Sequence, residues 1–240
     1  MSDQHDTPEP DKRPVALTVD RELATLRRRI VKEATTAVDM LEASLRALWM
    51  LDGALAREVR RGEKEVDREE VEIELECLRL LTLRHPFGTD FRFITFCLKV
   101  NGDIERVADH ASSIAKITLK LSALDQVPEW PRALSELGER LPVLCHRLLR
   151  AVLDQDELGA RALVKSDKTI DELDKRLFEE ITGLIERRPN FAEAGLWMYR
   201  VGRELERVGD LMCNIAEDVV YWATGEIIRH EKSIKPPHLG

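Results

Sequence analysis

The chain has 240 residues, of which 34% are charged and 5% aromatic, and its formal net charge at pH 7 is −8. This acidic balance argues against a general nucleic-acid-binding protein, and no apolar run approaches the roughly 20 residues that a membrane span needs. The polar first residues do not fit a signal peptide, and four isolated cysteines suit a reducing compartment. We therefore expect a cytoplasmic protein that reaches a membrane only through a partner.

The spacing of apolar residues predicts helices along most of the chain. The predicted segments of the first half are a disordered tail over 1–16, a long helix from residue 19 that breaks or kinks at 52–53 and continues to about 61, and helices over 63–84 and 88–122. Those of the second half are helices over 132–153, with Pro142 as a predicted kink, 156–187 and from about 190 past Trp222, and a tail over 229–240.

Pro128 and Pro131 mark a junction between two units, which we place at 17–125 and 126–228. Each unit is predicted to hold three helices, and short connections favour antiparallel neighbours. The expected fold class is all-α, with two tandem three-helix bundles.

The third helix of each unit carries the same stretch of sequence. NGDIERVADHASSIAKI begins at Asn101 and GRELERVGDLMCNIAED begins at Gly202, so that Glu105 and Asp109 correspond to Glu206 and Asp210. Chance similarity between charged helices does not keep Glu-Arg-Val-x-Asp-x4-Ile-Ala in register. The chain is therefore internally duplicated.

Each unit also has a second acidic pair at a spacing of four, on the preceding helix. Residues four apart lie on one face of a helix, so two pairs on adjacent helices can bring four carboxylates together. Such an anionic oxygen site suits hard ions such as Mg²⁺, Mn²⁺ or iron, and suits zinc less well. The candidate metal ligands are Glu63, Asp67, Glu105 and Asp109 in the first unit and Asp167, Asp171, Glu206 and Asp210 in the second.

An isolated pair of this kind is usually a solvated helix face, since 45 of the 240 residues are acidic. Glu105 and Asp109 point away from the apolar stripe of their helix, which places any metal at the outer surface. Asn214 is a further candidate oxygen ligand, and Arg106 and Arg207 either pair with a carboxylate of the adjoining helix or are solvated. His110 has no counterpart in the second unit and is interpreted as a non-ligand.

These residues resemble the PhoU family, which regulates the phosphate-specific transport system. The resemblance rests on the duplicated ERVxD-x4-IA, on the paired acidic motifs and on the loop RHPFGTDFR that begins at Arg84, and it covers about residues 17–225. It implies two similar three-helix bundles, each with a surface metal cluster held by the eight carboxylates above. It also implies a non-enzymatic protein that acts at the cytoplasmic face of the membrane.

The resemblance further implies two partners, the ATPase subunit of the phosphate transporter and the phosphate-sensing histidine kinase. Through them the protein would restrain phosphate uptake and repress the phosphate-starvation response. Ala108 replaces the family's glycine, which the second unit keeps as Gly209, and Ser113 replaces the asparagine kept as Asn214. These departures favour the second metal cluster over the first.

Other functions remain open at this point. Clustered metals can activate water, so a metal-dependent phosphohydrolase is an alternative. Others are an adaptor for a different transporter and a plain helical scaffold. Bound metal can also bridge to inorganic phosphate. A homodimer would follow if Trp49, Met50 or Trp197 forms an exposed patch, unless they fill the bundle cores.

Overall fold

The computed structural model describes residues 13–127 and 129–229, which form helices and short connections. The first half contains α1 (Arg13–Met50), α2 (Gly53–Arg84) and α3 (Gly88–Leu121). The second half contains α4 (Arg132–Asp154), α5 (Glu157–Val164), α6 (Asp167–Arg187), the 3-10 helix η1 (Pro189–Phe191) and α7 (Ala192–Thr224). The predicted fold class is confirmed, with α5 and α6 together in the place of one helix.

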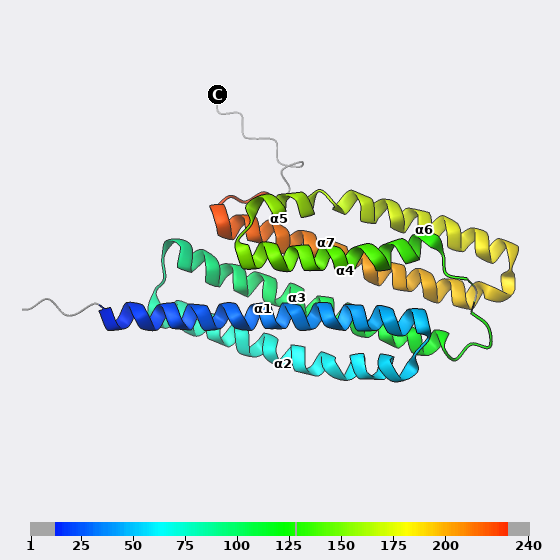
Figure 1. Ribbon diagram of the computed structural model, residues 1–240, viewed down its shortest axis with the longest axis horizontal. Coiled ribbons are helices and arrows are strands. Elements are labelled where there is room, and N and C mark those ends of the chain that lie inside the picture. The colour runs from blue at the N-terminus through cyan, green and yellow to red at the C-terminus, as the bar shows by residue number, and fades with distance from the viewer. Residues whose placement is uncertain (1–12, 128, 230–240) are drawn as a thin grey trace, which may run out of the picture.

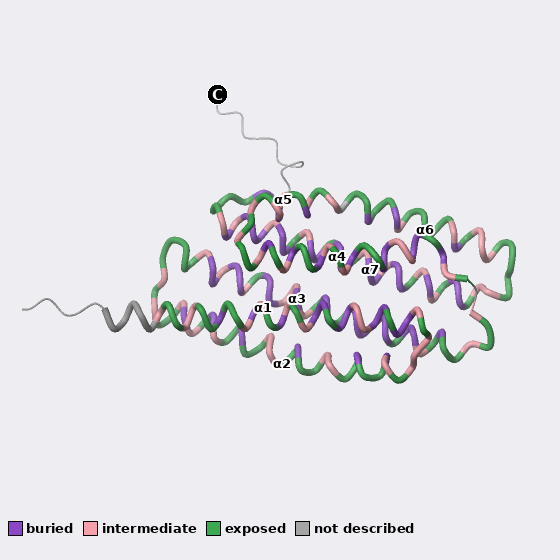
Figure 2. The backbone as a smooth tube through the Cα atoms, in the orientation of Figure 1, coloured by how far each residue is buried: buried purple, intermediate pink, exposed green. Residues whose placement is uncertain are grey.

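The two halves form two elongated layers that lie side by side (Figure 1). The helices with the duplicated stretch, α3 and α7, pack against each other, and α1 packs against α4. Helices of one half thus contact their own counterparts in the other. Buried residues follow the inward faces of the helices, and exposed residues cover the outward faces (Figure 2), as burial of apolar stripes requires.

Aromatic packing joins the two halves at one end of the α3–α7 contact. The ring of Trp222 on α7 stacks on Phe96 of α3, with 4.8 Å between ring centroids, and lies 5.0 Å from the ring of Phe93. The guanidinium of Arg27 on α1 lies 5.0 Å from the Trp222 ring centroid. Because the indole is fully buried, it anchors the second half to the first.

The duplication extends to the turns. The first long helix of each half ends in a left-handed residue, Leu51 in one and Gln155 in the other, both with φ 52. The aspartate that follows, Asp52 or Asp156, caps the next helix by accepting hydrogen bonds from N–H groups of its first turn. The two turns lie 104 positions apart, which fixes the register between the halves.

The predicted boundaries differ from the observed ones at this cap. The second helix was expected to start at 63, but α2 begins at Gly53 and continues through Gly62. The Asp52 cap supplies the start signal, whereas a glycine inside a helix costs only about 1 kcal/mol. A side chain at Gly62 would approach Met40, which is where α2 lies close to α1.

Two further boundaries were predicted wrongly. The helix expected over 156–187 is interrupted at Lys165 and Ser166, because the Ser166 hydroxyl and its N–H both donate to the carbonyl of Leu163. The first helix begins at Arg13 rather than at residue 19, since proline at position 14 is tolerated in a first helical turn. The tail expected over 1–16 was therefore wrong at 13–16, which are helical, and its remainder, with 230–240 of the tail expected over 229–240, lies outside the described residues.

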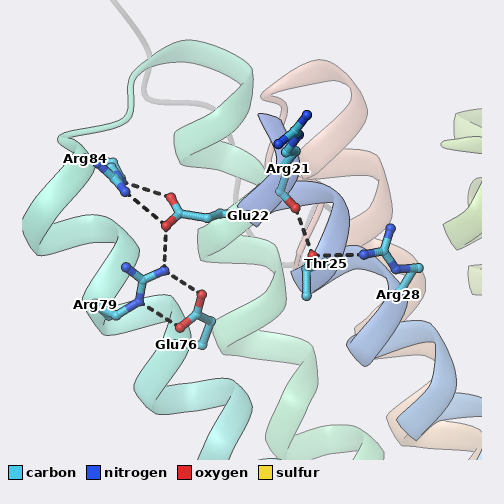
Figure 3. Close-up of polar contacts among 7 residues, drawn as sticks. All are labelled: Arg21, Glu22, Thr25, Arg28, Glu76, Arg79 and Arg84. Atoms are coloured by element: carbon cyan, nitrogen blue, oxygen red, sulfur yellow. Dashed lines mark hydrogen bonds and ion pairs between the residues drawn. The ribbon is translucent and has the colours of Figure 1, made fainter. Parts of the chain in front are cut away.

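An ion-pair network holds the end of α2 against α1 (Figure 3). Both carboxylate oxygens of Glu22 on α1 accept hydrogen bonds from Arg84, at 2.9 and 3.0 Å, and one also accepts from Arg79 at 3.0 Å. Arg79 in turn donates twice to Glu76. The hydrogen bonds from Arg84 hold the pKa of Glu22 below its usual value, so this network stays charged at neutral pH.

Cys77, Cys97 and Cys145 are buried, and Cys213 is partly buried. Within the described residues, no helix combines the length and the apolar character that a membrane crossing requires. Trp49 packs edge-on against Trp130 at 5.1 Å, whereas Met50 is 74% exposed. The homodimer stays a prediction.

Candidate metal site

Three of the predicted ligands converge in the first half. Asp67 on α2 and Glu105 and Asp109 on α3 each offer a carboxylate oxygen within 4.8 Å of the other two. Oxygens that share one Ca²⁺- or Mg²⁺-sized ion lie at most about 4–5 Å apart, which is twice the metal–oxygen distance. Asp67 and Asp109 are exposed and Glu105 is partly buried. The three oxygens therefore form a surface site of the size that a hard cation needs.

Glu63, the fourth predicted ligand of this half, lies beside the three. Its Oε2 accepts a hydrogen bond from the Ser112 hydroxyl of α3. Burial raises the pKa of Asp109, and the charges of Glu63 and Asp67 raise it further. Glu63 is thus close enough to act on the cluster, while one of its oxygens is engaged by the protein.

Uncompensated negative charge is the main electrostatic property of this site. Burial, followed by repulsion from Asp109 and Asp67, raises the pKa of Glu105 to about 7. Over residues 13–127 and 129–229, no Lys or Arg side chain forms an ion pair with Asp67, Glu105 or Asp109. A bound cation would remove this repulsion, and all-carboxylate ligands fit Mg²⁺, Mn²⁺ or iron.

Sequence reasoning missed a buried acidic residue on α1, the helix that packs against α2 and α3. Glu33 of α1 is only 2% exposed, and neither of its carboxylate oxygens has a hydrogen-bond partner. Burial raises its pKa to about 8, and the charges of Glu69, Glu70 and Glu105 add to the shift. A signal was present, because Glu33 falls on the apolar stripe formed by Leu26, Ile30, Ala37 and Leu41.

The second half is arranged differently. Asp171 and Asp210 are exposed and Glu206 is partly buried, while the side chain of Asp167 lies outside the described residues. Arg203 of α7 donates to Asp174 Oδ2 of α6 at 3.0 Å and lies 3.3 Å from Glu206 Oε1. A protein cation therefore already contacts the acidic residues of this half, and convergence of the four predicted ligands here stays a prediction.

The accessory candidates lie apart from the three converging carboxylates. Arg106 pairs with Asp103 on its own helix, at 3.5 Å, rather than with a carboxylate of the adjoining helix. Arg207 and Asn214 are exposed on α7. His110 contacts the second half, where its Nδ1 lies 2.7 Å from Glu204 Oε2.

Comparison with known proteins identifies the family to which this architecture belongs. The family model for the PhoU domain matches twice, over residues 30–118 and 134–219, with one match in each half. The chain belongs to the PhoU family. The PhoU resemblance of the duplicated stretch is thereby confirmed, and the two matches reproduce the tandem organisation.

Similar PhoU proteins align over nearly their full length. The phosphate-specific transport system accessory protein PhoU homolog of Deinococcus radiodurans is 34% identical over 190 residues, covering 79% of this chain and 89% of that one. The Caulobacter vibrioides homolog is 28% identical, covering 88% and 92%. The crystal structure of PhoU from Pseudomonas aeruginosa superposes with a TM-score of 0.83 at 28% identity, covering 86% of this chain and 99% of that one.

The first-half site leads to a direct prediction. Replacing Asp67 and Asp109 by asparagine removes two of the three converging carboxylates, so Mn²⁺ retained by the purified chain should fall by at least one equivalent. Elemental analysis after metal loading and desalting measures this. An equally helical variant with unchanged metal content would show that these acids are only a solvated face. Asp39→Asn, an exposed acid on α1, is the matched control.

Proposed function

We propose that this PhoU-family chain is a non-enzymatic regulator of phosphate homeostasis that restrains high-affinity phosphate uptake and represses the phosphate-starvation response. The observation that carries the proposal is the match of both halves to relatives named as phosphate-specific transport system accessory proteins, 89% and 92% of whose lengths are covered. Solved relatives include the phosphate transport system regulatory protein PhoU from Streptococcus pneumoniae, which superposes with a TM-score of 0.80.

In this proposal the chain acts in the cytoplasm and reaches the inner membrane through its partners. The partners are the ATPase subunit of the phosphate transporter and the phosphate-sensing histidine kinase. The long helices expose extended outer faces for such contacts (Figure 2). An adaptor needs no nucleophile or general base, because it acts by binding to its partners.

In this proposal the carboxylate site makes phosphate recognition by the regulator depend on bound metal. The site would hold Fe, Mn or Mg through Asp67, Glu105 and Asp109, with Glu63 at its edge. A metal ion held by carboxylates keeps open coordination positions, which phosphate oxygens can fill. Metal loading would thus let the chain sense inorganic phosphate or a phosphorylated partner.

Affinity purification tests the regulatory proposal. A tagged full chain, produced in its own host under phosphate-replete conditions, should recover the phosphate transporter ATPase and the sensor kinase, as identified by mass spectrometry. Recovery of a different transporter's ATPase would assign the chain to that system instead. Recovery of no transport or kinase component from crosslinked cells would refute the proposal.

Phosphate binding is tested separately by calorimetry. Phosphate titrated into Mn²⁺-loaded protein should release heat that is absent from metal-stripped protein and from the Asp67→Asn, Asp109→Asn variant. Heat of equal size in stripped protein would place phosphate away from the metal. The same samples should not hydrolyse a generic phosphatase substrate, and Mn²⁺-dependent turnover would favour the phosphohydrolase alternative.

A further inference from the structure

The internal duplication allows each half to serve as a reference for the other. The α3 and α7 stretches correspond at a spacing of 101 residues, and the earlier helices correspond at 104. By this register, Arg203 of the second half corresponds to Gly102 of the first, and Asp174 corresponds to Glu70. The acidic positions are thus repeated, whereas the basic side chain beside them is not.

In the second half, the guanidinium of Arg203 links the two helices that carry the acidic motifs. It bonds to Asp174 on α6 and lies within ion-pair distance of Glu206 on α7. Each of these two carboxylates keeps one buried oxygen without a partner. The second half therefore retains ligand capacity, but a fixed positive charge already stands among its acids.

In the first half, the corresponding space is open. A Cβ added at Gly102 would meet no atom within 4 Å beyond its chain neighbours and the backbone of its own helix. The acidic character is also greater on this side, because Glu33 stands where the second half has Leu137, and both positions are buried. Glu33 has no partner for either oxygen, and the charge of Glu105 acts on it. This half has no cation at the position of Arg203, and the guanidinium of Arg29 on α1 pairs with Glu69 and Glu72 of α2 rather than with the three converging carboxylates.

We propose that the two halves bind metal unequally, because Arg203 acts as a built-in competitor for the cation in the second half while Gly102 leaves the first half open. The inference rests on the metal site of the proposed function and adds to it a preferred half and the residue that sets the preference. It reverses the expectation from Ala108 and Ser113, which favoured the second half. A metal ion entering there competes with, and is repelled by, a guanidinium that already contacts Asp174 and Glu206. We expect an affinity difference of about tenfold or more.

Reciprocal substitutions test the proposal on the metal-stripped full chain, with Mn²⁺ as the probe and free Mn²⁺ followed by electron paramagnetic resonance. Wild type should show two classes of Mn²⁺ sites. The tight class should be abolished in the double variant Asp67→Asn, Asp109→Asn, and the other class should bind Mn²⁺ about tenfold more weakly than the tight one. Arg203→Ala should tighten the weak class by about tenfold. Arg200→Ala removes an exposed charge one turn away on the same helix, and it should leave both classes unchanged.

The converse substitution installs the competitor in the first half. Gly102→Arg places a guanidinium three residues before Glu105, as Arg203 stands before Glu206, and should weaken the tight class by about tenfold. Gly102→Gln adds a side chain without charge and should leave the affinity of the tight class unchanged. Circular dichroism confirms that each variant is folded.

Equal affinities in the two halves of wild type, or equal effects of Arg203→Ala and Arg200→Ala, would overturn the inference. So would equal effects of Gly102→Arg and Gly102→Gln, or the absence of Mn²⁺ binding by wild type and all variants. These results leave the regulatory proposal intact if the purification recovers the transporter ATPase. If the purification fails but Mn²⁺ still binds in two classes of unequal affinity, the regulatory proposal is rejected and the inference that the two halves bind metal unequally stands.

Discussion

Replacing Trp222 by alanine is expected to lower the free energy of unfolding by about 3–5 kcal/mol, the usual cost of deleting a large buried aromatic side chain. The indole is 1% exposed and packs on Phe93 and Phe96 across the contact between the halves. Its loss leaves a cavity between α3 and α7 and removes the surface on which Arg27 rests. Urea unfolding followed by circular dichroism measures the change.

Trp197→Ala is the matched control, since Trp197 lies on the same helix but is only partly buried. It should cost clearly less than Trp222→Ala. Equal losses for the two variants would show that the contact between the halves contributes little to stability. A loss below about 1 kcal/mol for Trp222→Ala would contradict the observed packing.

Replacing Glu33 by leucine, the residue that the second half carries at the corresponding position, is expected to stabilise metal-free protein by about 3 kcal/mol at pH 7. Burial raises the pKa of Glu33 from its ordinary value of 4.5 to about 8 in the folded chain. Folding therefore favours the protonated acid, and each pKa unit between 4.5 and the working pH costs about 1.4 kcal/mol. Leucine removes this cost and also fills the site with apolar volume.

The direction of the pH dependence follows from the same shift. Below pH 4.5 the carboxyl of Glu33 is neutral in both states and costs nothing through ionisation. As pH rises from 4.5 to 8 the unfolded chain ionises first, so the stability of wild type falls across this window relative to Glu33→Leu. Urea unfolding at pH 5, 6, 7 and 8 in chelator should show this gap widening with pH.

Two variants separate charge from packing. Glu33→Gln abolishes the pH-dependent part while it keeps the polar group buried, so it should gain less than leucine. Leu137→Glu makes the reverse change in the second half and should destabilise. A gap between wild type and Glu33→Leu that stays constant with pH would mean that Glu33 does not ionise with the shifted pKa.

Most of the fold could be predicted from the sequence because its signals are local and repeated. The apolar stripe of α3 and the matching stretch of α7 fix two equivalent helices, and the prolines mark the ends of α2 and of the first half. The errors arose where two local signals compete. Gly62 was taken as a stronger break than the Asp52 cap, and the hydrogen bonds of Ser166 that divide α5 from α6 leave no mark in the periodicity.

The candidate site was predictable in part, for a physical reason. A spacing of four places Glu105 and Asp109 on one face, and the preceding helix brings Asp67 to them. Which cation meets which acid depends on helix rotation and on side chains far apart in sequence. The contact of Arg203 with Asp174, 29 residues away, could not be predicted from spacing, whereas the burial of Glu33 was indicated by its place on the apolar stripe of α1 and was missed.

The contacts of α1 with α4 and of α3 with α7 also bear on how such a protein evolves. In an assembly of identical subunits, one gene supplies both sides of an interface, so every substitution is imposed twice. Here counterpart helices meet within one polypeptide, and each side of the contact is encoded by its own stretch of the gene, so that one side can change without the other. Differences such as Gly102 against Arg203 can therefore be selected in one half alone, and covalent fusion has turned a repeated unit into two modules whose chemistry is free to diverge.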